Sequence, residues 1–434
     1  MSLKNKKHAF PLYAQIIIGM GLGIIGGLIA SHYHWISFTD NWIKPWGSIF
    51  IKLLKLVAMP LIVVSLINGI VQLKDISRLS ILGFRTIIFY IITTTIAIII
   101  GLGLANSIEP GKFISVEKRN ELLSKSSQKY IVPEKPESKP LDFIENLVPD
   151  NIVNATGNNR NMLQVIFFTF LFGISLLLVK NEKKKFLIAI FDVSNDVILK
   201  IIDIIMKYAP LGVFALMMSL IVDFAGNNLT DALSLFSALG MYSLTVVIGL
   251  IFMILVIYPM ALKLFSNIRP KKFFKGLFPA QLLAFSTSSS AATLPVTMEQ
   301  CQKELDMSEE TTGFVLPIGA TINMDGTSLY QSVAAIFIAQ VFGIDLSLSE
   351  QLTIVVTALL ASIGAAAVPG AGIIMLIIVL TAVGLPVEGI VIIMAVDRIL
   401  DMLRTVVNVT SDATVTAIVD AYLKKLKKKN LHNT

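Results

Sequence analysis

The fold depends on one uncharged stretch, residues 352–387, which reads LTIVVTALLASIGAAAVPGAGIIMLIIVLTAVGLPV. As a single α-helix its 36 residues would extend ~54 Å, whereas the hydrocarbon core of a bilayer is about 30 Å thick. The middle of the stretch contains Pro369, Gly370 and Gly372, and proline and glycine both interrupt helices. We therefore expect two half-length helices joined by a tip, which is a re-entrant hairpin. The alternative is a pair of proline-kinked spans.

The composition of the whole chain indicates a membrane protein. Of its 434 residues 55% are hydrophobic and only 15% are charged, with a mean hydropathy of +0.76. The strands of a membrane β-barrel would appear as segments of about ten alternating residues, whereas the apolar runs here are long and continuous. The first run, residues 10–30, is too long for a signal-peptide core and has no convincing cleavage site. The sequence predicts an all-α polytopic membrane protein.

The apolar runs predict eight transmembrane helices and two interrupted segments. The eight spans are 10–30, 48–73, 81–106, 161–179, 186–222, 232–264, 311–342 and 388–420. The two remaining segments are about 273–300 and 351–386. The first of these has the same plan as the second, with STSSSAATLP at its centre, so we expect two re-entrant helical hairpins.

Charge in the connecting segments predicts the orientation. The connections MSLKNKK, KDISR, KNEKKK, RPKK and KKLKKKN are basic, whereas SHYHWISFTD, DFAGNNLTD and FGIDLSLSE contain no Lys or Arg. The two sets alternate along the chain, and basic loops usually remain in the cytoplasm, so both termini are predicted to be cytoplasmic. The long polar segment 107–160 then falls outside, as an irregular external loop.

Six polar residues of the last span share one side of the helix. At 100° per residue they fall within an arc of about 100°. They are Asp397, Asp401, Arg404, Thr405, Asn408 and Asp412. A charge at the bilayer centre costs at least ~2.5 to 3.5 kcal/mol, so such groups usually face a bundle interior or a wet cavity. A structural ion pair between Asp401 and Arg404 is the alternative, but it would not require Asn408 on the same stripe, so we favour a ligand site.

A second polar group lies in the middle of the seventh span, where residues 319–327 read GATINMDGT. Asn323 and Asp325 cannot face the same way on a regular helix, and Gly319 and Gly326 flank them, which predicts an unwound stretch. Carboxylate, amide and carbonyl oxygens together are ligands for a hard cation. The alternative is a kinked helix with one buried, hydrogen-bonded aspartate.

Two further groups offer hydroxyls. In the third span Tyr90, Thr93 and Thr94 share a face, although threonines in membrane helices often bond only their own backbone. At the centre of the first interrupted segment Ser286 and residues 288–290 lie where half-helix N-termini would supply N–H groups to an anion, although serine-rich tips are also found as simple flexible turns.

The sequence contains no motif that indicates an enzyme. HExxH, GxSxG and P-loop patterns are absent, and the four histidines lie near span ends or termini. The single cysteine, Cys301, allows no intrachain disulfide. An intramembrane aspartyl protease would also use buried aspartates, but Arg404 beside Asp401 would hold that carboxylate ionised rather than sharing a proton.

Four motifs, SSSAATLP, NMDGTSLY, VPGAG and DRILDMLRTVVNVTSD, resemble in order the signatures of the glutamate/aspartate transporter family, the dicarboxylate/amino acid:cation symporters, in a bacterial-type member. The match covers nearly the whole chain. The resemblance implies a homotrimer of elevator-type transporters with eight spans and two oppositely oriented hairpins. It implies scaffold spans in 1–80 and 161–222, a transport domain in 81–106 and 223–423, the external loop 107–160 and a basic cytoplasmic tail, 424–434.

The resemblance also implies roles for individual residues. Arg404 would bind the side-chain carboxylate of the substrate and Asp401 its amino group, while its main-chain carboxylate would be bound by Asn408, Ser289 and Ser290. The pocket would be completed by Thr327, Val368, Gly372 and Thr405. One sodium ion would be bound by Gly319, Asn323, Asn408 and Asp412, and a second by Tyr90, Thr93, Thr94, Asn323 and Asp325. A third would be bound at the second hairpin by Thr321, Ser362 and Ile363.

The chain departs from the family pattern at three positions. Ala365 stands where some sodium-coupled relatives have threonine near the third ion. Ser288 and Met402 stand where relatives often have an additional arginine, and Arg398 is a candidate to replace it.

These observations predict secondary active import of acidic amino acids, L-aspartate or L-glutamate, coupled to sodium entry across the cell membrane. The expected partners are the small-molecule substrate, the lipid bilayer and copies of the same chain, with no nucleic acid and no cofactor beyond the co-transported cations. Asn323 and Asp325 with three hydroxyls favour sodium, because a proton needs only one titratable group. The alternatives are a proton-coupled glutamate or C4-dicarboxylate symporter and, from another class, an ion channel or membrane-embedded protease. Asp401 disfavours a pure dicarboxylate carrier, because a substrate without an amine gives it no partner.

Overall fold

Helices make up every regular element of the described chain. The computed structural model describes residues 12–72, 80–114, 148–157, 161–181, 183–225, 229–363 and 370–431. The helices of the first half are α1 (Leu12–His32), α2 (Ile36–Phe38), α3 (Lys44–Gln72), α4 (Ser80–Ile108), α7 (Ile152–Thr156), α8 (Met162–Leu178) and α9 (Lys184–Ala225). Those of the second half are α10 (Leu229–Phe252), α11 (Tyr258–Phe265), α12 (Pro270–Thr287), α13 (Ser290–Lys303), α14 (Glu309–Ile322), α15 (Asp325–Val341), α16 (Leu348–Ile363), α17 (Ala371–Ala382) and α18 (Ile390–Leu431).

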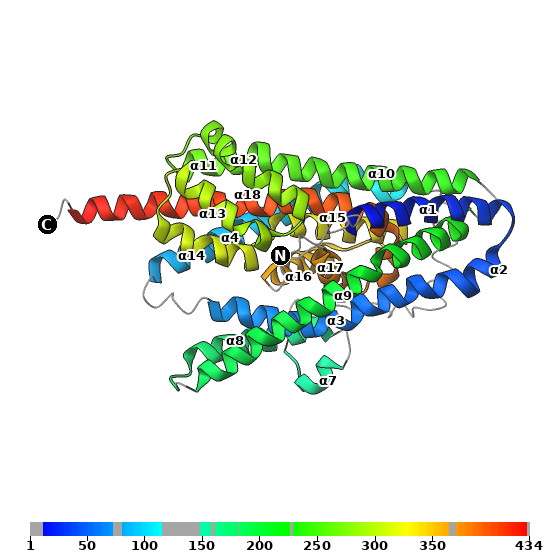
Figure 1. Cartoon of the computed structure of the whole chain (residues 1–434), viewed down its shortest axis with the longest axis horizontal. Coiled ribbons are helices and arrows are strands. Elements are labelled where there is room, and N and C mark those ends of the chain that lie inside the picture. Colours follow the sequence, from blue (N-terminus) through cyan, green and yellow to red (C-terminus); the bar gives the residue numbers. More distant parts are fainter. Residues whose placement is uncertain are drawn as a thin grey trace, which may run out of the picture.

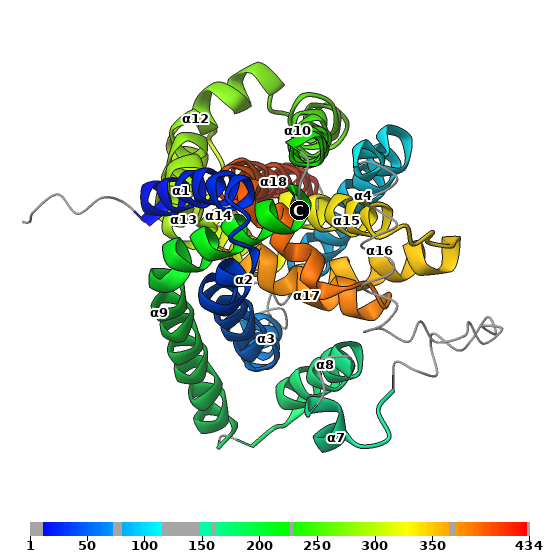
Figure 2. The ribbon, with the colours of Figure 1, turned by 90° about the vertical axis from the view of Figure 1, so that its right-hand side faces the viewer.

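The helices pack in two groups. In the first, α9 packs against α1 and α3, and α3 packs against α8. In the second, α18 is surrounded by α10 to α15, and α15 also packs against α4 and α16. The long helices run roughly along the longest axis, and α18 extends beyond the rest at its C-terminal end (Figure 1). Viewed along that axis, α8 and α3 lie on one side of α17 and α10 on the other (Figure 2).

Glycines allow α1 and α9 to approach closely. A Cβ added at Gly19 would lie 2.5 Å from the carbonyl oxygen of Pro210, and one at Gly23 would lie 2.5 Å from that of Phe214. Small residues one helical turn apart let helix backbones meet, which is a common packing device between membrane helices. The two helices therefore form one tightly packed unit.

The seventh predicted span is broken where the sequence predicts an unwound stretch. Helix α14 ends at Ile322 and α15 begins at Asp325, with the extended residues Asn323 and Met324 between them. Helix α15 is buried on all sides, and only Gln340 of its 17 residues is not fully buried. The break therefore lies inside the protein rather than on its surface.

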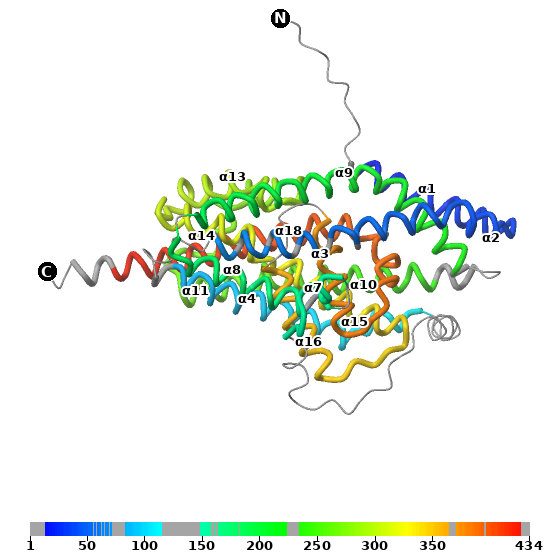
Figure 3. The backbone as a smooth tube through the Cα atoms, turned by 90° about the horizontal axis from the view of Figure 1, so that it is seen from below, coloured from blue at the N-terminus to red at the C-terminus, as the bar shows by residue number. Residues whose placement is uncertain are grey.

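Each of the two interrupted segments forms a pair of helices that pack against each other. Helices α12 and α13 are joined at Ser288, whose backbone has φ +51°, and Ser289 caps the N-terminus of α13. Helices α16 and α17 form the second pair, and Gly370, with φ +81°, begins α17. Residues 364–369, which include Ala365 and Val368, lie outside the described residues. In Figure 3 α13 lies along one edge of the molecule and α16 near the opposite edge.

Five helical segments of the described chain are long and apolar enough to cross a membrane, judged by length and composition. They are Ala14–His32, Ile36–Asn68, Gly83–Phe113, Lys184–Asp223 and Ser234–Phe265. Of the other three predicted spans, the fourth forms the 17-residue helix α8, the seventh is the broken pair α14 and α15, and the eighth is α18 with its charged stripe. The described residues of the predicted spans are helical apart from the break at Asn323 and Met324 and a few residues at span ends, which confirms the all-α fold class, and the number of spans stays a prediction.

The described parts of the segment 107–160 contain short helical elements. Helix α4 continues to Ile108, and a 3-10 turn, Pro110–Phe113, follows it. Before α8 the short helix α7 is capped by Asn151, whose side chain accepts a hydrogen bond from Val153 N at 2.8 Å. Capping and turn contacts thus form short helical turns in these described parts, and the external loop over 107–160 stays a prediction.

Candidate functional site

The polar stripe of α18 faces the interior of the second helix group. All six of its predicted members are buried, and Arg404 is completely so. Ion pairs join Arg404 Nη2 to Asp401 Oδ1 at 2.8 Å and to Asp397 Oδ1 at 3.1 Å. The guanidinium also lies 3.8 Å from the centre of the Tyr330 ring, a favourable cation–π position. The structural ion pair considered from the sequence is therefore present.

Both aspartates contact the same nitrogen of the Arg404 guanidinium, Nη2. Arg404 Nε and Nη1 are buried without a hydrogen-bond partner. A buried donor left without a partner costs about 1 to 3 kcal/mol, and more when it is charged. Guanidinium groups bind planar carboxylates through two parallel hydrogen bonds. The geometry of Arg404 therefore fits a ligand that carries a carboxylate, which a purely structural network would not require.

The start of α17, in the second helix pair, covers the guanidinium group of Arg404. The backbone N–H of Gly370 donates to Asp401 Oδ2 at 3.1 Å. A Cβ at Gly372 would lie 3.1 Å from Arg404 Nη1, so the backbone there passes directly over the guanidinium. Gln331 Nε2 on α15 lies 3.4 Å from the carbonyl oxygen of Gly372. The start of α17 thus forms one wall of the site.

Asn408 connects the stripe to the broken helix. Its Oδ1 accepts a hydrogen bond from Gly326 N at 2.8 Å, and its Nδ2 donates to Thr327 Oγ1 at 3.2 Å and to Met324 Sδ at 3.3 Å. Thr405, one turn before, donates its hydroxyl to the carbonyl of Asp401 at 2.8 Å. Thr327 and Asn408 therefore lie together, as the predicted pocket requires.

Asp325 lies at the centre of a group of hydroxyls. Its Oδ1 accepts hydrogen bonds from Thr94 at 2.7 Å and Thr93 at 3.3 Å, and its Oδ2 from Ser411 at 2.7 Å and Tyr258 at 3.0 Å. Thr93 and Thr94 were predicted, whereas Tyr258 and Ser411 were missed. At 100° per residue Ser411 lies only about 20° outside the predicted stripe, so a slightly wider arc would have included it. Tyr258 gave no such signal, because it lies in an apolar helix.

A second group of oxygens adjoins Asp325. Asn323 Nδ2 donates to Asp412 Oδ1 at 2.8 Å, and Thr94 Oγ1 donates to Asn323 Oδ1 at 3.3 Å. A Cβ at Gly319 would lie 2.5 Å from Asp412 Oδ1 and closer still to the Tyr90 hydroxyl. The Tyr90 hydroxyl donates to the carbonyl of Val315. The structure thus brings these predicted cation ligands together at the break between α14 and α15.

The predicted third set makes mostly local contacts. Thr321 Oγ1 donates to the carbonyl of Ile318 at 2.8 Å, and Ser362 Oγ donates to that of Leu359 at 3.0 Å. Ser362 Oγ also lies 3.5 Å from the carbonyl oxygen of Ile322, so the end of α16 adjoins the end of α14. Ile363 is the last described residue before the tip.

At the first hairpin the predicted tip residues Ser289 and Ser290 are buried. Ser289 Oγ accepts a hydrogen bond from Ala292 N at 3.2 Å, and α13 packs against α14 and α18. The tip therefore belongs to the same helix group as the stripe.

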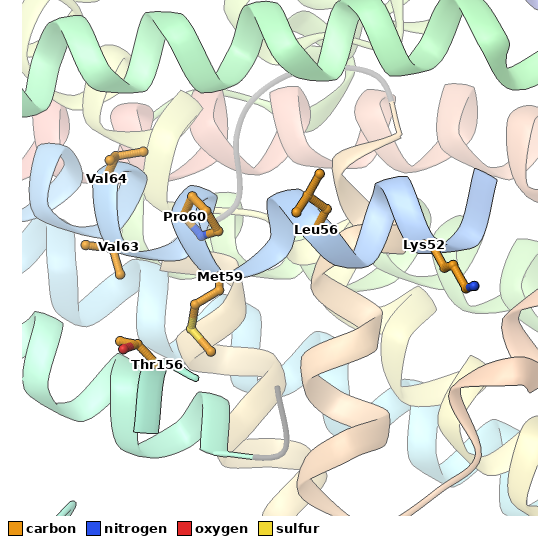
Figure 4. Close-up of a pocket in the computed structure, with 7 residues that line it drawn as sticks. All are labelled: Lys52, Leu56, Met59, Pro60, Val63, Val64 and Thr156. Atoms are coloured by element: carbon orange, nitrogen blue, oxygen red, sulfur yellow. The ribbon is translucent and has the colours of Figure 1, made fainter. Parts of the chain in front are cut away.

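The oxygen groups do not form a metal centre of charged ligands. Within the described chain no three His, Cys, Asp or Glu side chains gather as metal ligands. Asp325 and Asp412 are instead accompanied by the hydroxyl groups of Thr93, Thr94, Tyr258 and Ser411 and by the side-chain amide of Asn323. A separate groove on α3 is lined mainly by apolar side chains, with Lys52 at one end and Thr156 of α7 opposite (Figure 4). It carries no converging polar groups.

Buried charged residues beside a helix that is broken in mid-span are features of secondary transporters. The chain belongs to the sodium:dicarboxylate symporter family, which matches residues 12–422. Its members are membrane transporters and not enzymes, and the resemblance stated from the motifs is confirmed.

Relatives from bacteria and animals match nearly the whole chain. The proton/sodium-glutamate symport protein of Bacillus subtilis (strain 168) is 36% identical over 419 residues, which cover 96% of this chain and 94% of the relative. The proton/glutamate-aspartate symporter of Escherichia coli (strain K12) is 34% identical, covering 98% and 96%. Excitatory amino acid transporter 3 of Oryctolagus cuniculus is 36% identical, covering 95% and 86%.

Proposed function

We propose that the protein is a secondary active symporter that imports acidic amino acids, L-aspartate or L-glutamate, coupled to sodium entry. The observation that carries the proposal is the buried Arg404, which retains free donors for a carboxylate beside an aspartate suited to an ammonium group. The names of the bacterial relatives, which mention glutamate and aspartate, support the same substrate class.

When it binds, the substrate replaces the contact between Arg404 and Asp401 with its own contacts to each of them. Its side-chain carboxylate takes Arg404, and its ammonium group takes Asp401. Asn408 and the tip residues Ser289 and Ser290 bind its main-chain carboxylate. Residues that complete the pocket are Thr327, Val368, Gly372 and Thr405. Two charge-assisted contacts of opposite sign select a zwitterion with a second carboxylate.

The co-transported cations bind at the oxygen groups. Asp325 with Tyr90, Thr93, Thr94 and Asn323 forms one site, and Asp412 with Gly319, Asn323 and Asn408 forms another. Thr321, Ser362 and Ile363 contribute to a third at the second hairpin. An amide and several hydroxyls around one carboxylate support sodium over a proton, because a proton carrier needs only one titratable group.

The arrangement of helices supports an elevator mechanism. The group around α18 carries both the substrate and cation sites, while α1, α3, α8 and α9 form the scaffold against which it moves. We infer eight transmembrane spans, two oppositely oriented re-entrant hairpins, cytoplasmic termini in the cell membrane and a homotrimer, all of which the family resemblance supports.

A proton-coupled glutamate symporter is the second candidate, favoured by the names of the two bacterial relatives, which both include protons. A C4-dicarboxylate symporter is the third, favoured by the name of the family. Uptake of labelled aspartate, glutamate and succinate into proteoliposomes, with sodium and pH gradients imposed separately, tests all three. We expect aspartate or glutamate uptake that rises sigmoidally with external sodium at equal pH. Uptake that did not depend on the sodium concentration but increased with an inward proton gradient would overturn sodium coupling.

A further inference from the structure

A second arginine, Arg398, reaches the same aspartate as Arg404. Its Nη1 lies 3.4 Å from Asp401 Oδ2, the oxygen that also accepts the N–H of Gly370. Arg404 instead pairs with Asp401 Oδ1. The Arg398 side chain is only 16% exposed, and its Nε is buried without a hydrogen-bond partner. Asp401 therefore lies between two guanidinium groups.

Arg398 lines a cavity together with Asp401. Helices α1, α3 and α9 line one side of this cavity with apolar side chains, and α17 and α18 line the other. Asp397, Arg398 and Asp401 are the charged residues among the described residues that line it. A guanidinium facing apolar walls has few alternatives to Asp401 as a partner.

The charges of this cluster balance only when both arginines are counted. Asp397 and Asp401 face Arg398 and Arg404, two of each sign. In the proposed function a substrate carboxylate draws Arg404 toward itself. An amino-acid substrate compensates by offering its ammonium group to Asp401, but a dicarboxylate without an amine offers nothing. Removing one partner of a buried ion pair is strongly unfavourable unless another cation replaces it.

We propose that Arg398 is a specificity-determining residue that serves as the replacement counter-ion of Asp401. It allows the site to accept C4-dicarboxylates, which lack an amino group, beside acidic amino acids. The proposal rests on the proposed function, because it needs Asp401 to be the amine site. Without Arg398 the substrate amine becomes essential.

The test is competition by unlabelled succinate and L-aspartate against labelled L-aspartate bound to the full-length protein at saturating sodium. The quantity measured is the ratio of the inhibition constants, succinate over aspartate. We expect Arg398→Met to raise this ratio at least about tenfold, equivalent to ~1.4 kcal/mol of selectivity. Arg398→Gln, which keeps more of the side chain's polar character, gives a second neutral variant should the first fail to fold. Arg398→Lys, which keeps the charge, should change the ratio by less than about threefold.

Lys52→Met is the matched control for the loss of one positive charge, because Lys52 is an exposed residue of α3 that does not line this cavity. Its ratio should equal that of the wild type. An unchanged ratio in both neutral variants, an equal change in the Lys52 control, or a wild type that succinate does not inhibit would each overturn the role of Arg398. A wild type that binds no aspartate would instead refute the proposed function.

Discussion

Adding one methyl group at Gly319 tests whether the break between α14 and α15 binds the driving cation. In Gly319→Ala the new Cβ would lie 2.5 Å from Asp412 Oδ1, whereas ordinary contacts begin near 3.4 Å. Either the new Cβ or Asp412 Oδ1 must move by about 0.9 Å, the difference between these distances, and the Tyr90 hydroxyl, which lies closer still, must give way as well. Oxygen ligands of hard cations must lie within a few tenths of an ångström of their ideal distance. The substitution therefore displaces Asp412 or Tyr90, both of which are proposed cation ligands.

The expected loss follows from the energy of one such contact. A hydrogen bond or similar contact with a charged group contributes ~1.5 to 3 kcal/mol, so sodium affinity should fall about 10- to 100-fold. The measurement is the external sodium concentration that gives half-maximal aspartate uptake in proteoliposomes, together with the rise in Tm that sodium produces in the purified protein.

Gly313→Ala is the matched control. Gly313 lies in the same helix, and nothing lies within 4 Å of a Cβ added there. Both substitutions raise helix propensity by the same amount, up to ~1 kcal/mol. The difference between their half-maximal sodium concentrations therefore reports the effect on the oxygen atoms near Gly319. If the two variants require the same sodium concentration within about twofold, the break does not bind the driving cation and the reasoning fails.

Three further predictions follow from the other residues of the site. Arg404→Cys should abolish uptake of acidic amino acids and admit small neutral ones, because two charge-assisted hydrogen bonds of ~1.5 to 3 kcal/mol each are lost; near-native aspartate affinity would contradict the role of Arg404. Asp325→Asn should raise the sodium concentration needed for uptake at least about tenfold, since four hydroxyls converge on this carboxylate; an unchanged sodium response would defeat the assignment. Ala371→Cys, in the Cys301→Ser background, should react more slowly with a thiol reagent once substrate and cation are bound. A reaction rate that neither ligand changes would count against closure of the second hairpin.

The sequence predicted best what depends on the periodicity of a single helix. The stripe of α18 is buried as expected, because one apolar rod can place ionised residues only on its inner face. The break at Asn323 and Met324 was also predictable, since glycines and polar residues in mid-span do not favour a continuous helix. The re-entrant nature of the hairpins stays a prediction, and the tip residues Ala365 and Val368 lie outside the described chain.

Contacts between helices could not be predicted in the same way. The hydroxyls around Asp325 come from α4, α11 and α18, which are far apart in sequence. Periodicity shows which residues share a face but not which faces meet, so Tyr258 remained hidden in an apolar helix. The contact between Arg398 and Asp401 could not be predicted for the same reason: a spacing of three residues permits the pair, but only packing against the apolar cavity makes Asp401 the preferred partner.

In the proposed symporter the substrate and cation sites share one structural element. Asn408 lies one turn after Arg404 and one turn before Asp412, and its side chain holds Gly326 N and Thr327 on the far side of the helix break. Arg404 and Asp412 are two turns apart with Asn408 between them, so in the proposed mechanism a substrate at Arg404 and a cation at Asp412 act on the same short segment of α18. Reciprocal coupling between two ligands requires that each favour the same arrangement of a shared element. In the proposed symporter that element is the segment of α18 from Arg404 to Asp412 together with the break it contacts, so substitution of Asn408 by Ala should weaken substrate and sodium binding together.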